Sequence, residues 1–358
     1  MHIAVDYQSS QGKRTGIGVF ASNLCSEISD LKPEWKFSFQ TNSKERDLNT
    51  PKRIFWESCT LPIRMMSLKP DIVYSPGFAP AIFSPVKQIV TVHDLIGMIY
   101  PLNLPLGARF YWSYWLPLCV KRASVCIASS ESTRNDMVRL LGMDSQKIRV
   151  VPLDANAVYR TPADMQNDAV ARFGLKKPFL VTVGTLEPRK NLMRLVQAVN
   201  IIKKSEHLDF QIAVCGKGGG QQELIISEIK KYGLEDTIKL LGYVSDEDIR
   251  DLYHASEGYC IVSLYEGFGL PVLEAMCCGR SGVCSDRSSL PEVAGDAAVY
   301  VNPESTDNIA DGIIRFLSDH EARRSLNVRA VEMSEKFSWK KTAMNMIDVF
   351  LEVENAKK

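Results

Sequence analysis

Residues 263–282 read Ser-Leu-Tyr-Glu-Gly-Phe-Gly-Leu-Pro-Val-Leu-Glu-Ala-Met-Cys-Cys-Gly-Arg-Ser-Gly. The short apolar run 258–262 before them predicts a buried strand. The glycines of 267–269 predict a tight turn. Pro271 suits the first turn of a helix, because its missing N–H is not needed there. We therefore expect a strand, a glycine turn and a helix that continues to Cys278.

A strand that passes through such a turn into a helix favours an anion site. The first N–H groups of a helix have no partner within it, and the helix dipole adds about half a positive charge there. Phosphate commonly binds at such a place, and glycines let the backbone approach it. Glu266 and Glu274 could accept hydrogen bonds from two parts of one ligand, such as sugar and ribose hydroxyls. The alternative is that Glu266 caps the helix and Glu274 is a solvated helix residue.

Glu266 and Glu274, with seven residues between them, resemble the E-x7-E signature of the family-4 retaining glycosyltransferases. The match includes the intervening Gly-Phe-Gly-Leu-Pro. The resemblance implies an α/β protein with the GT-B fold, in which two Rossmann-like domains face each other across a cleft. It also implies that Glu266 orients the transferred sugar and that Glu274 binds the ribose of a nucleotide-sugar donor. The predicted donor site then includes the backbone of Gly267, Phe268, Gly269 and Leu270.

The overall composition is that of an ordinary globular protein. Of the 358 residues, 45% are apolar and 24% are charged, and the net charge of +1 implies no polyanionic partner such as a nucleic acid. No apolar run is long enough for a membrane span, and Met1 leads directly into a strand, so we expect a cytoplasmic protein without a signal peptide. The nine cysteines predict buried free thiols in a reducing compartment and no zinc site.

Alternating strand and helix patterns predict two domains with mostly parallel sheets covered on both faces. We expect an N-terminal acceptor-side domain over 1–160, a polar connection over 154–177 and a nucleotide-sugar-binding domain over 175–335. In the resembled family, a last helix such as 338–354 packs back on the N-terminal domain. Further predicted strands are 3–5, 71–74, 88–92, 124–128, 147–151, 179–183, 210–215 and 237–241, and further predicted helices are 19–28, 192–202, 222–231 and 246–254.

A second loop, Gly184-Thr-Leu-Glu-Pro-Arg-Lys-Asn191, carries two adjacent cations at a predicted helix start. Cations at a helix start are repelled by the positive end of the helix dipole. A diphosphate between the cations and the helix would remove this repulsion. Arg189 could hold phosphate oxygens in a bidentate way, and Lys190 supplies a compact charge. Two solvated surface charges are the alternative. The family resemblance favours a donor diphosphate at this loop, with Gly184 as part of the site. The family usually has arginine directly after the glycine, but this sequence has Thr185 there.

Three N-terminal segments also resemble parts of the family's cleft. Gly16-Ile-Gly18 follows the first strand and resembles the glycine-rich loop near the donor diphosphate, with a plain turn as the alternative. His93 follows a strand at the edge where α/β folds bind ligands, and it resembles the family's histidine near the transferred sugar. Glu131 and Ser132 resemble a loop near the cleft.

Two segments have less specific signals. Tyr243 and Val244 resemble the family's nucleoside-base loop, which meets the base mainly through backbone atoms; an ordinary strand end is the alternative. Residues 106–122 mix aromatic and basic side chains, as at a membrane interface or a lipid-linked acceptor site. A helix with one face in the core would show the same mixture.

The resemblance implies retaining transfer without a metal cofactor, with Glu266, His93, Lys190 and Arg189 as the catalytic group. In that mechanism, the departing phosphate takes the proton of the acceptor hydroxyl, and the cations stabilise the leaving charge. The Pro-Arg-Lys-Asn and Val-His-Asp-Leu segments resemble bacterial mannosyltransferases of surface-polysaccharide synthesis. GDP-mannose is therefore the first expected donor and a UDP-sugar the second, with a glycan or lipid-linked acceptor.

Two other interpretations remain open from the sequence. A NAD-dependent oxidoreductase could share a doubly wound fold, but it needs a third glycine that the turn at Gly16 and Gly18 lacks. A non-catalytic protein that binds nucleotide sugars is the other.

Overall fold

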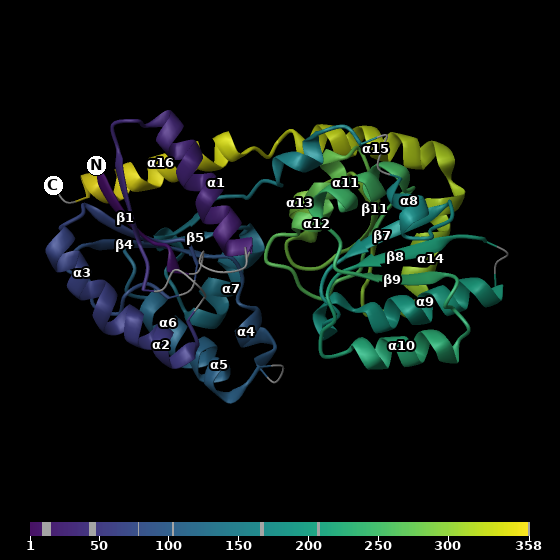
Figure 1. The fold of residues 1–358 in the computed structure, drawn as a ribbon, viewed down its shortest axis with the longest axis horizontal. Coiled ribbons are helices and arrows are strands. Elements are labelled where there is room, and N and C mark those ends of the chain that lie inside the picture. The colour runs from purple at the N-terminus through teal and green to yellow at the C-terminus, as the bar shows by residue number, and fades with distance from the viewer. Residues whose placement is uncertain are drawn as a thin grey trace. The chain divides into compact units, whose positions relative to one another are not determined.

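The protein forms two α/β units, each built on a parallel sheet of six strands (Figure 1). Unit 1 contains residues 1–153 and 337–358, and unit 2 contains residues 154–336. The sheets confirm the predicted α/β class. A computed structural model describes residues 1–8, 16–42, 48–77, 79–101, 104–164, 168–205 and 208–356.

The strands of unit 1 are β1 His2–Asp6, β2 Lys36–Gln40, β3 Ile72–Ser75, β4 Lys87–Val92, β5 Val125–Ala128 and β6 Ile148–Val150. Their order is β2-β1-β3-β4-β5-β6. The chain order reverses between β1 and β3, which marks the topological switch point where such folds bind ligands. The sequence analysis did not predict β2, because this edge strand has no buried residue to mark it.

The helices of unit 1 are α1 Gly16–Leu31, α2 Thr50–Phe55, α3 Leu61–Leu68, α4 Ile96–Ile99, α5 Leu106–Phe110, α6 Leu116–Val120, α7 Glu131–Leu141 and α16 Trp339–Asn355, with a short 3₁₀ turn, η5 Ser145–Lys147. Two π-helical turns, η2 Trp56–Thr60 and η4 Tyr111–Trp115, join α2 to α3 and α5 to α6. The sequence did not predict either π turn.

The predicted turn at Gly16 and Gly18 is wrong, because α1 already begins at Gly16. Glycine has a low helix propensity, but buried packing of the Gly18 face outweighs it here. Helix α16 lies beside α1 in unit 1 (Figure 1). Thr342 Oγ1 donates a hydrogen bond of 2.8 Å to the carbonyl oxygen of Pro152, and Arg149 pairs with Glu352, so α16 is fixed to this unit.

The strands of unit 2 are β7 Phe179–Val183, β8 Gln211–Cys215, β9 Ile238–Gly242, β10 Gly258–Ile261, β11 Gly282–Ser285 and β12 Ala298–Val301. Their order is β12-β11-β10-β7-β8-β9, all parallel. This is the strand order of dinucleotide-binding folds, with its switch point between β7 and β10. Loops that follow β7 and β10 therefore meet where a nucleotide is expected.

The helical elements of unit 2 are η6 Ala157–Arg160, α8 Ala169–Arg172, η7 Pro188–Lys190, α9 Leu192–Ser205, α10 Gln222–Lys231, α11 Asp246–Ala255, α12 Leu270–Cys277, α13 Leu290–Ala294, α14 Thr306–Ser318 and α15 His320–Ser334. The predicted connection 154–177 is not a bare linker, because η6 and α8 belong to unit 2. The Tyr159 hydroxyl, for example, donates a 3.2 Å hydrogen bond to Asp246 on α11.

Both cores consist of apolar strands covered by helices. Every residue of β5, β8 and β10 is buried, as parallel strands with both faces covered require. All nine cysteines are free thiols, and seven of them are buried. Cys277 is half-buried, and Cys59 is exposed, so the prediction of buried thiols is wrong for Cys59.

Candidate active site

The central stretch folds as a strand, a glycine turn and a helix. Helix α12 begins at Leu270 with Pro271 in its first turn. Gly269 precedes it at φ +109°, where a Cβ would also lie 2.8 Å from Leu290, so this position requires glycine. No side chain among the described residues caps α12. The helix start thus keeps the positive character that an anion would meet.

Glu266 lies in the loop between β10 and α12, where its carboxylate is surrounded by donors. Oε1 accepts hydrogen bonds from Lys190 Nζ at 2.6 Å and Ser263 Oγ at 2.7 Å. Oε2 accepts one from Arg189 Nη1 at 2.9 Å. The Glu266 N–H donates to Ser288 Oγ at 2.9 Å, which fixes the backbone as well. Glu266 and both predicted cations therefore form one cluster, which we call the Glu266 cluster.

The electrostatics of the Glu266 cluster favour the ionised carboxylate. Burial raises the pKa of Glu266, but the charges of Lys190 and Arg189 and the hydrogen bonds from Lys190 and Ser263 lower it more. The pKa is thus held below its ordinary value. The side chains of Lys190 and Glu266 are only 10% and 9% exposed, so solvent screens this pair weakly. The interpretation of Arg189 and Lys190 as two solvated surface charges is wrong.

The loop after β7 holds Lys190 in place. A Cβ on Gly184, whose φ is +151°, would lie 2.7 Å from Lys190 Cε, so the lysine side chain passes directly over this glycine. The next residue along, Asn191, adopts a left-handed conformation and donates to the carbonyl oxygens of Val262 at 3.0 Å and Pro303 at 2.7 Å. The loop after β7 is thereby fastened to the end of β10, across the switch point.

Glu274 lies one turn into α12 and is half-buried. Burial raises the pKa of its carboxyl to about 8, the charge of nearby Asp246 adds to that, and Lys190 opposes it. A half-buried side chain does not match the fully solvated helix residue of that alternative. The helix-cap alternative for Glu266 is wrong too, since its carboxylate bonds Lys190 and Arg189 instead.

The predicted base loop follows β9. Val244 is buried, whereas Tyr243 is 71% exposed, with Lys217 Nζ 4.8 Å from the centre of its ring. Lys217 belongs to a run, Gly216-Lys-Gly-Gly-Gly220, that sequence reasoning missed. A Cβ on Gly216 would lie 1.9 Å from the carbonyl oxygen of Gly184, so this glycine lets the loop after β8 touch the loop after β7. A glycine run directly after a strand was the signal that could have revealed it.

His93 lies at the carboxyl end of β4 in unit 1. Its Nε2 is 2.8 Å from the carbonyl oxygen of Pro76, so Nε2 carries the hydrogen and Nδ1 can accept. The Phe20 ring contacts the imidazole edge-on at 4.8 Å. Burial lowers the pKa of His93, against the opposing effects of the Pro76 hydrogen bond and the Asp94 charge. His93 is therefore a neutral, oriented imidazole at neutral pH.

Glu131 and Ser132 lie in the first turn of α7. Glu131 is exposed and pairs with Arg134 at 3.0 Å, as surface helix residues commonly do. Residues beside them hold the backbone at His93, because Ser129 Oγ and Thr133 Oγ1 donate to its main-chain carbonyl oxygen at 2.8 and 3.3 Å. The contacts between this segment and His93 thus come from neighbours that the sequence analysis did not name.

A buried polar network in unit 1 was also missed. Glu57 of η2 accepts hydrogen bonds from the Tyr111 hydroxyl at 2.8 Å and from Trp115 Nε1 at 2.9 Å, both in η4. The Tyr111 hydroxyl also accepts from the Ala79 N–H, just after β3. Burial raises the pKa of Glu57 to about 8, although Arg53 and both hydrogen bonds act in the opposite direction. Both π turns therefore meet at a neutral carboxyl near the switch point.

Metal ligation has little structural basis in the described residues, which contain no group of three or more His, Cys, Asp or Glu side chains able to hold an ion. Asp246 and Asp248 lie in the first turn of α11. Asp246 accepts from Asn156 and Tyr159, and Asp248 pairs with Arg172. Metal independence remains a prediction about the reaction.

Comparison with known proteins assigns the family. Residues 165–333 match a family model described as glycosyl transferases group 1, and residues 42–153 match the model of glycosyltransferase family 4. O-antigen chain mannosyltransferase B of Escherichia coli is 30% identical over 270 residues, which cover 74% of this chain and 70% of that protein. The chain belongs to the family-4 glycosyltransferases.

A further relative and a solved structure agree with the assignment of this family-4 glycosyltransferase. The serotype-specific mannosyltransferase WbdA of Escherichia coli is 27% identical over 98% of this chain, which spans 48% of WbdA. Sucrose-phosphate synthase from Thermosynechococcus elongatus has the same fold, with a TM-score of 0.78, 18% identity and coverage of 99% of this chain and 100% of that one. The predicted GT-B fold is confirmed, and the oxidoreductase interpretation is set aside.

Proposed function

We propose that this family-4 glycosyltransferase transfers mannose from GDP-mannose to a hydroxyl of a glycan or lipid-linked acceptor in surface-polysaccharide synthesis. The observation that carries the donor part is the Glu266 cluster at the start of α12. Two cations, one buried carboxylate and a helix start meet there at the switch point of a nucleotide-binding sheet. The choice of mannose is supported by the relatives, O-antigen chain mannosyltransferase B and WbdA.

Each residue of the Glu266 cluster has a chemical task in this proposal. Lys190 and Arg189 stabilise the negative charge that develops on the diphosphate as the sugar departs. Lysine has three donors and arginine five, so both can bind phosphate oxygens while they hold Glu266. Oε2 accepts from Arg189 and has room for a second donor, such as a hydroxyl of the transferred sugar.

Glu274 and the base loop would hold the rest of the nucleotide. A protonated Glu274 carboxyl both donates and accepts, which suits a pair of ribose hydroxyls. Gly16, Gly18 and His93 of unit 1 remain predicted contributors near the diphosphate and the transferred sugar. Glu131 and Ser132 remain weaker candidates, because the structure gives Glu131 a surface salt bridge instead.

The donor is tested by hydrolysis and transfer assays with a panel of nucleotide sugars. GDP-mannose is expected to give the highest kcat/KM, with release of GDP and mannosylation of a soluble glycan acceptor. A UDP-sugar with the highest kcat/KM would replace the donor assignment and leave the transferase assignment intact. Tight binding of a nucleotide sugar without release of any nucleoside diphosphate would favour the non-catalytic alternative.

Retention and metal independence are separate parts of the proposal. NMR of the first product should show the α-anomer, the configuration that mannose has in GDP-mannose. An excess of chelator should leave kcat unchanged, because Lys190 and Arg189 supply the positive charge that a divalent ion supplies elsewhere. A β-linked first product would contradict retention, and a rate restored only by Mg²⁺ or Mn²⁺ would contradict metal independence.

A lipid-linked acceptor would bring the protein to the inner face of a membrane. None of the helices within the described ranges has the length and apolar character needed to cross a bilayer. Residues 106–122 remain the predicted contact, and part of this segment is exposed: Phe110, Tyr114 and Leu118 have exposed fractions of 52%, 69% and 42%. Flotation with liposomes tests this contact. Full activity without flotation would contradict it.

A further inference from the structure

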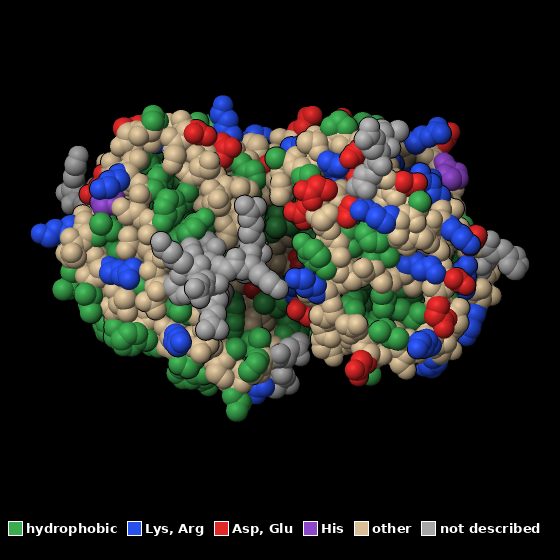
Figure 2. Space-filling view, viewed as in Figure 1, with side chains coloured by type: hydrophobic (Ala, Val, Ile, Leu, Met, Phe, Trp, Pro, Cys, Tyr) green, Lys and Arg blue, Asp and Glu red, His purple; other side chains and the backbone are tan. Residues whose placement is uncertain are grey.

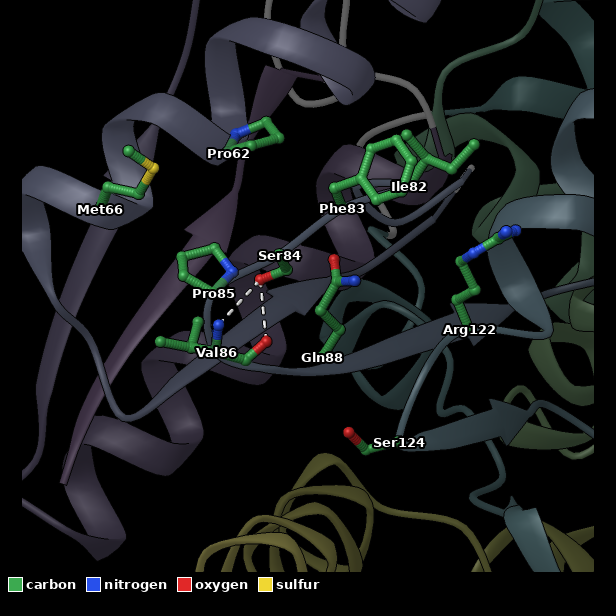
Figure 3. Close-up of a pocket in the computed structure, with 10 residues that line it drawn as sticks. All are labelled: Pro62, Met66, Ile82, Phe83, Ser84, Pro85, Val86, Gln88, Arg122 and Ser124. Carbon is green, nitrogen blue, oxygen red and sulfur yellow. Dashed lines mark hydrogen bonds between the residues drawn. The ribbon is translucent and has the colours of Figure 1, made fainter.

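A groove opens in unit 1 at the amino ends of β4 and β5 (Figure 3). Its volume is about 550 Å³, and it is lined by Pro62, Met66, Ile82, Phe83, Ser84, Pro85, Val86, Gln88, Arg122 and Ser124. His93 follows the opposite end of β4, about 16 Å from Gln88 at roughly 3.3 Å per residue. The groove is therefore separate from the edge of the sheet that carries His93.

Gln88 gives the groove an unpartnered acceptor. The side chain is only 5% exposed, and its Nε2 donates a 2.7 Å hydrogen bond to the carbonyl oxygen of Ala81. This bond fixes the orientation of the amide, because a flipped amide would place two carbonyl oxygens against each other. Oε1 has no hydrogen-bond partner among the described residues. A buried carbonyl oxygen of this kind indicates a ligand with an N–H or O–H donor.

Figure 3 shows the Gln88 amide pointing toward Phe83, with Ser84 on one side and Arg122 on the other. Arg122 is exposed, and Nη1 donates to the carbonyl oxygen of Leu118 at 3.1 Å. It pairs with no carboxylate in the described parts of the chain, so its charge can meet an anion. The lining of the groove thus includes both an acceptor and a cation.

The rim of the groove is apolar and exposed. Met66 of α3 and Phe83 of the loop before β4 have exposed fractions of 59% and 69%, and Ile63 of α3 has 63%. Phe110, Tyr114 and Leu118, which precede Arg122 at intervals of four residues in α5, η4 and α6, are exposed as well. Figure 2 shows hydrophobic side chains gathered over α2, α3 and α5 of unit 1. Exposed apolar side chains around a cationic site are typical of proteins that lie on a membrane.

We propose that this groove binds the headgroup of a phospholipid that carries a primary ammonium, such as phosphatidylethanolamine. The phosphate meets Arg122, the ammonium donates to Gln88 Oε1, and the acyl chains leave along Met66 and Phe83. One headgroup thereby supplies both the anion and the donor that the groove lacks. The exposed apolar rim favours a lipid in a bilayer over a free phosphoamine. This site anchors unit 1 independently of the donor chemistry in unit 2.

The test uses the full chain and sedimentation with vesicles. Vesicles of phosphatidylcholine with phosphatidylethanolamine should bind at least about tenfold more tightly than vesicles of phosphatidylcholine alone, whose quaternary ammonium has no N–H to donate. Arg122→Gln should lose about tenfold of that affinity, the effect of one charge-assisted hydrogen bond. Lys147→Gln is the matched control, since Lys147 is exposed just before β6, beside β5, but lies outside both the groove and residues 106–122, and it should lose less than about twofold.

Gln88→Met keeps the side-chain length, removes the acceptor and should abolish the preference for phosphatidylethanolamine. Equal binding of both vesicle types by the unchanged protein overturns the proposal. Equal losses in Arg122→Gln and Lys147→Gln would show diffuse electrostatics, and an unchanged preference in Gln88→Met would show that Oε1 is merely hydrated; either result overturns the proposal as well. Tight binding of free glycerophosphoethanolamine without vesicle binding would show a soluble ligand and no membrane site. Sugar transfer to a soluble acceptor should be unchanged in Arg122→Gln, which separates this proposal from the donor assignment.

Discussion

The two sheets have the same number of strands and the same parallel direction, but their carboxyl edges hold a glutamate in opposite states. In unit 2, Glu266 contacts two cations, and its pKa is held below its ordinary value. In unit 1, Glu57 is bonded to the neutral donors of Tyr111 and Trp115, and burial raises its pKa to about 8. The fold is shared, and the neighbouring side chains decide whether the buried carboxyl is charged.

The difference agrees with a division of tasks between the units. In the proposed mechanism, a departing diphosphate needs positive charge, which Lys190 and Arg189 would supply in unit 2. An acceptor sugar is neutral and needs oriented hydrogen-bonding groups, which His93 and the Glu57 network of unit 1 would supply under the same proposal. The two π turns at Glu57 fit this interpretation, because such turns occur frequently at functional sites.

The largest loss of kcat is expected from removal of the Lys190 charge in unit 2. Lys190→Ala should lower kcat by about two to three decades, the typical loss for one oriented group that stabilises developing charge. It also leaves Glu266 without its 2.6 Å partner, so the fold should lose some stability too. Steady-state kinetics with the preferred nucleotide sugar measure the loss, and circular dichroism checks the fold.

Lys231→Ala is the matched control for this loss of charge, because Lys231 lies on α10 and pairs with Glu228 at the surface. Its kcat should stay within about twofold of the unchanged protein, since surface pairs contribute little. A Lys190→Ala enzyme with near-normal kcat would refute the catalytic role of the Glu266 cluster. The contrast between the charged site of unit 2 and the neutral site of unit 1 would then have no functional meaning.

A smaller loss of kcat is expected when Lys190 is kept but its side chain is displaced. Gly184→Ala puts a Cβ 2.7 Å from Lys190 Cε and strains a residue at φ +151°. Kinetics should show a loss of roughly ten- to a hundredfold in kcat, and unfolding should cost about 1–3 kcal/mol less free energy. Gly220→Ala is the control, because a Cβ at Gly220 would meet nothing within 4 Å, and it should be nearly silent. Equal rates in both variants would show that Lys190 needs no support from Gly184.

The loops around Glu266 show what the sequence could and could not predict. The turn and helix of residues 267–278 were predictable, because Gly269 and Pro271 act through local backbone geometry. The bond between Lys190 and Glu266 was not, since these residues lie 76 positions apart and meet only when β7 and β10 become neighbours. The family resemblance placed both residues at the donor without revealing that they bond each other.

Unit 1 was harder to predict for a related reason. Nothing in the pattern around Trp56 or Tyr111 marks a π turn, because one extra residue in a helical turn barely changes the apolar spacing. The network at Glu57 joins two such turns that lie 54 positions apart. His93 was proposed as a site residue only because a strand end and a family motif coincide there, and its role stays a prediction. Tertiary contacts, which periodicity does not encode, therefore define most of this edge.

The two buried glutamates should respond to pH in opposite directions. Burial disfavours the ionised form of Glu57. The stabilising contribution of its neutral carboxyl is therefore complete below the ordinary pKa of 4.5 and is lost as the pH rises toward about 8. Glu266 has a lowered pKa, so its contribution is present above 4.5 and is lost as the pH falls below that value. Denaturant unfolding at a series of pH values should show both trends, at about 1.4 kcal/mol for each unit of pKa shift.

Glu57→Gln and Glu266→Gln separate these trends. The first variant should gain stability relative to the unchanged protein between about pH 4.5 and 8, because Gln mimics the protonated carboxyl. The second should differ most from the unchanged protein near neutral pH and approach it in acid. Parallel pH profiles for the two variants would mean that both carboxyls have the same protonation state. The two units would then not differ in the charge of their buried glutamates.

The smallest effect is expected at an exposed ring. Tyr243 of unit 2 is as exposed as Phe83 of unit 1, at 71% and 69%, but Lys217 covers its face at 4.8 Å. If the base contacts the backbone at this loop, Tyr243→Ala should weaken GDP binding by less than about threefold in calorimetry, the effect of one exposed cation–π contact. A loss above about tenfold would instead indicate that the base stacks on the ring, since such stacking contributes about 1–3 kcal/mol. In that case the exposed ring of Tyr243 would be a direct contact of the nucleotide base.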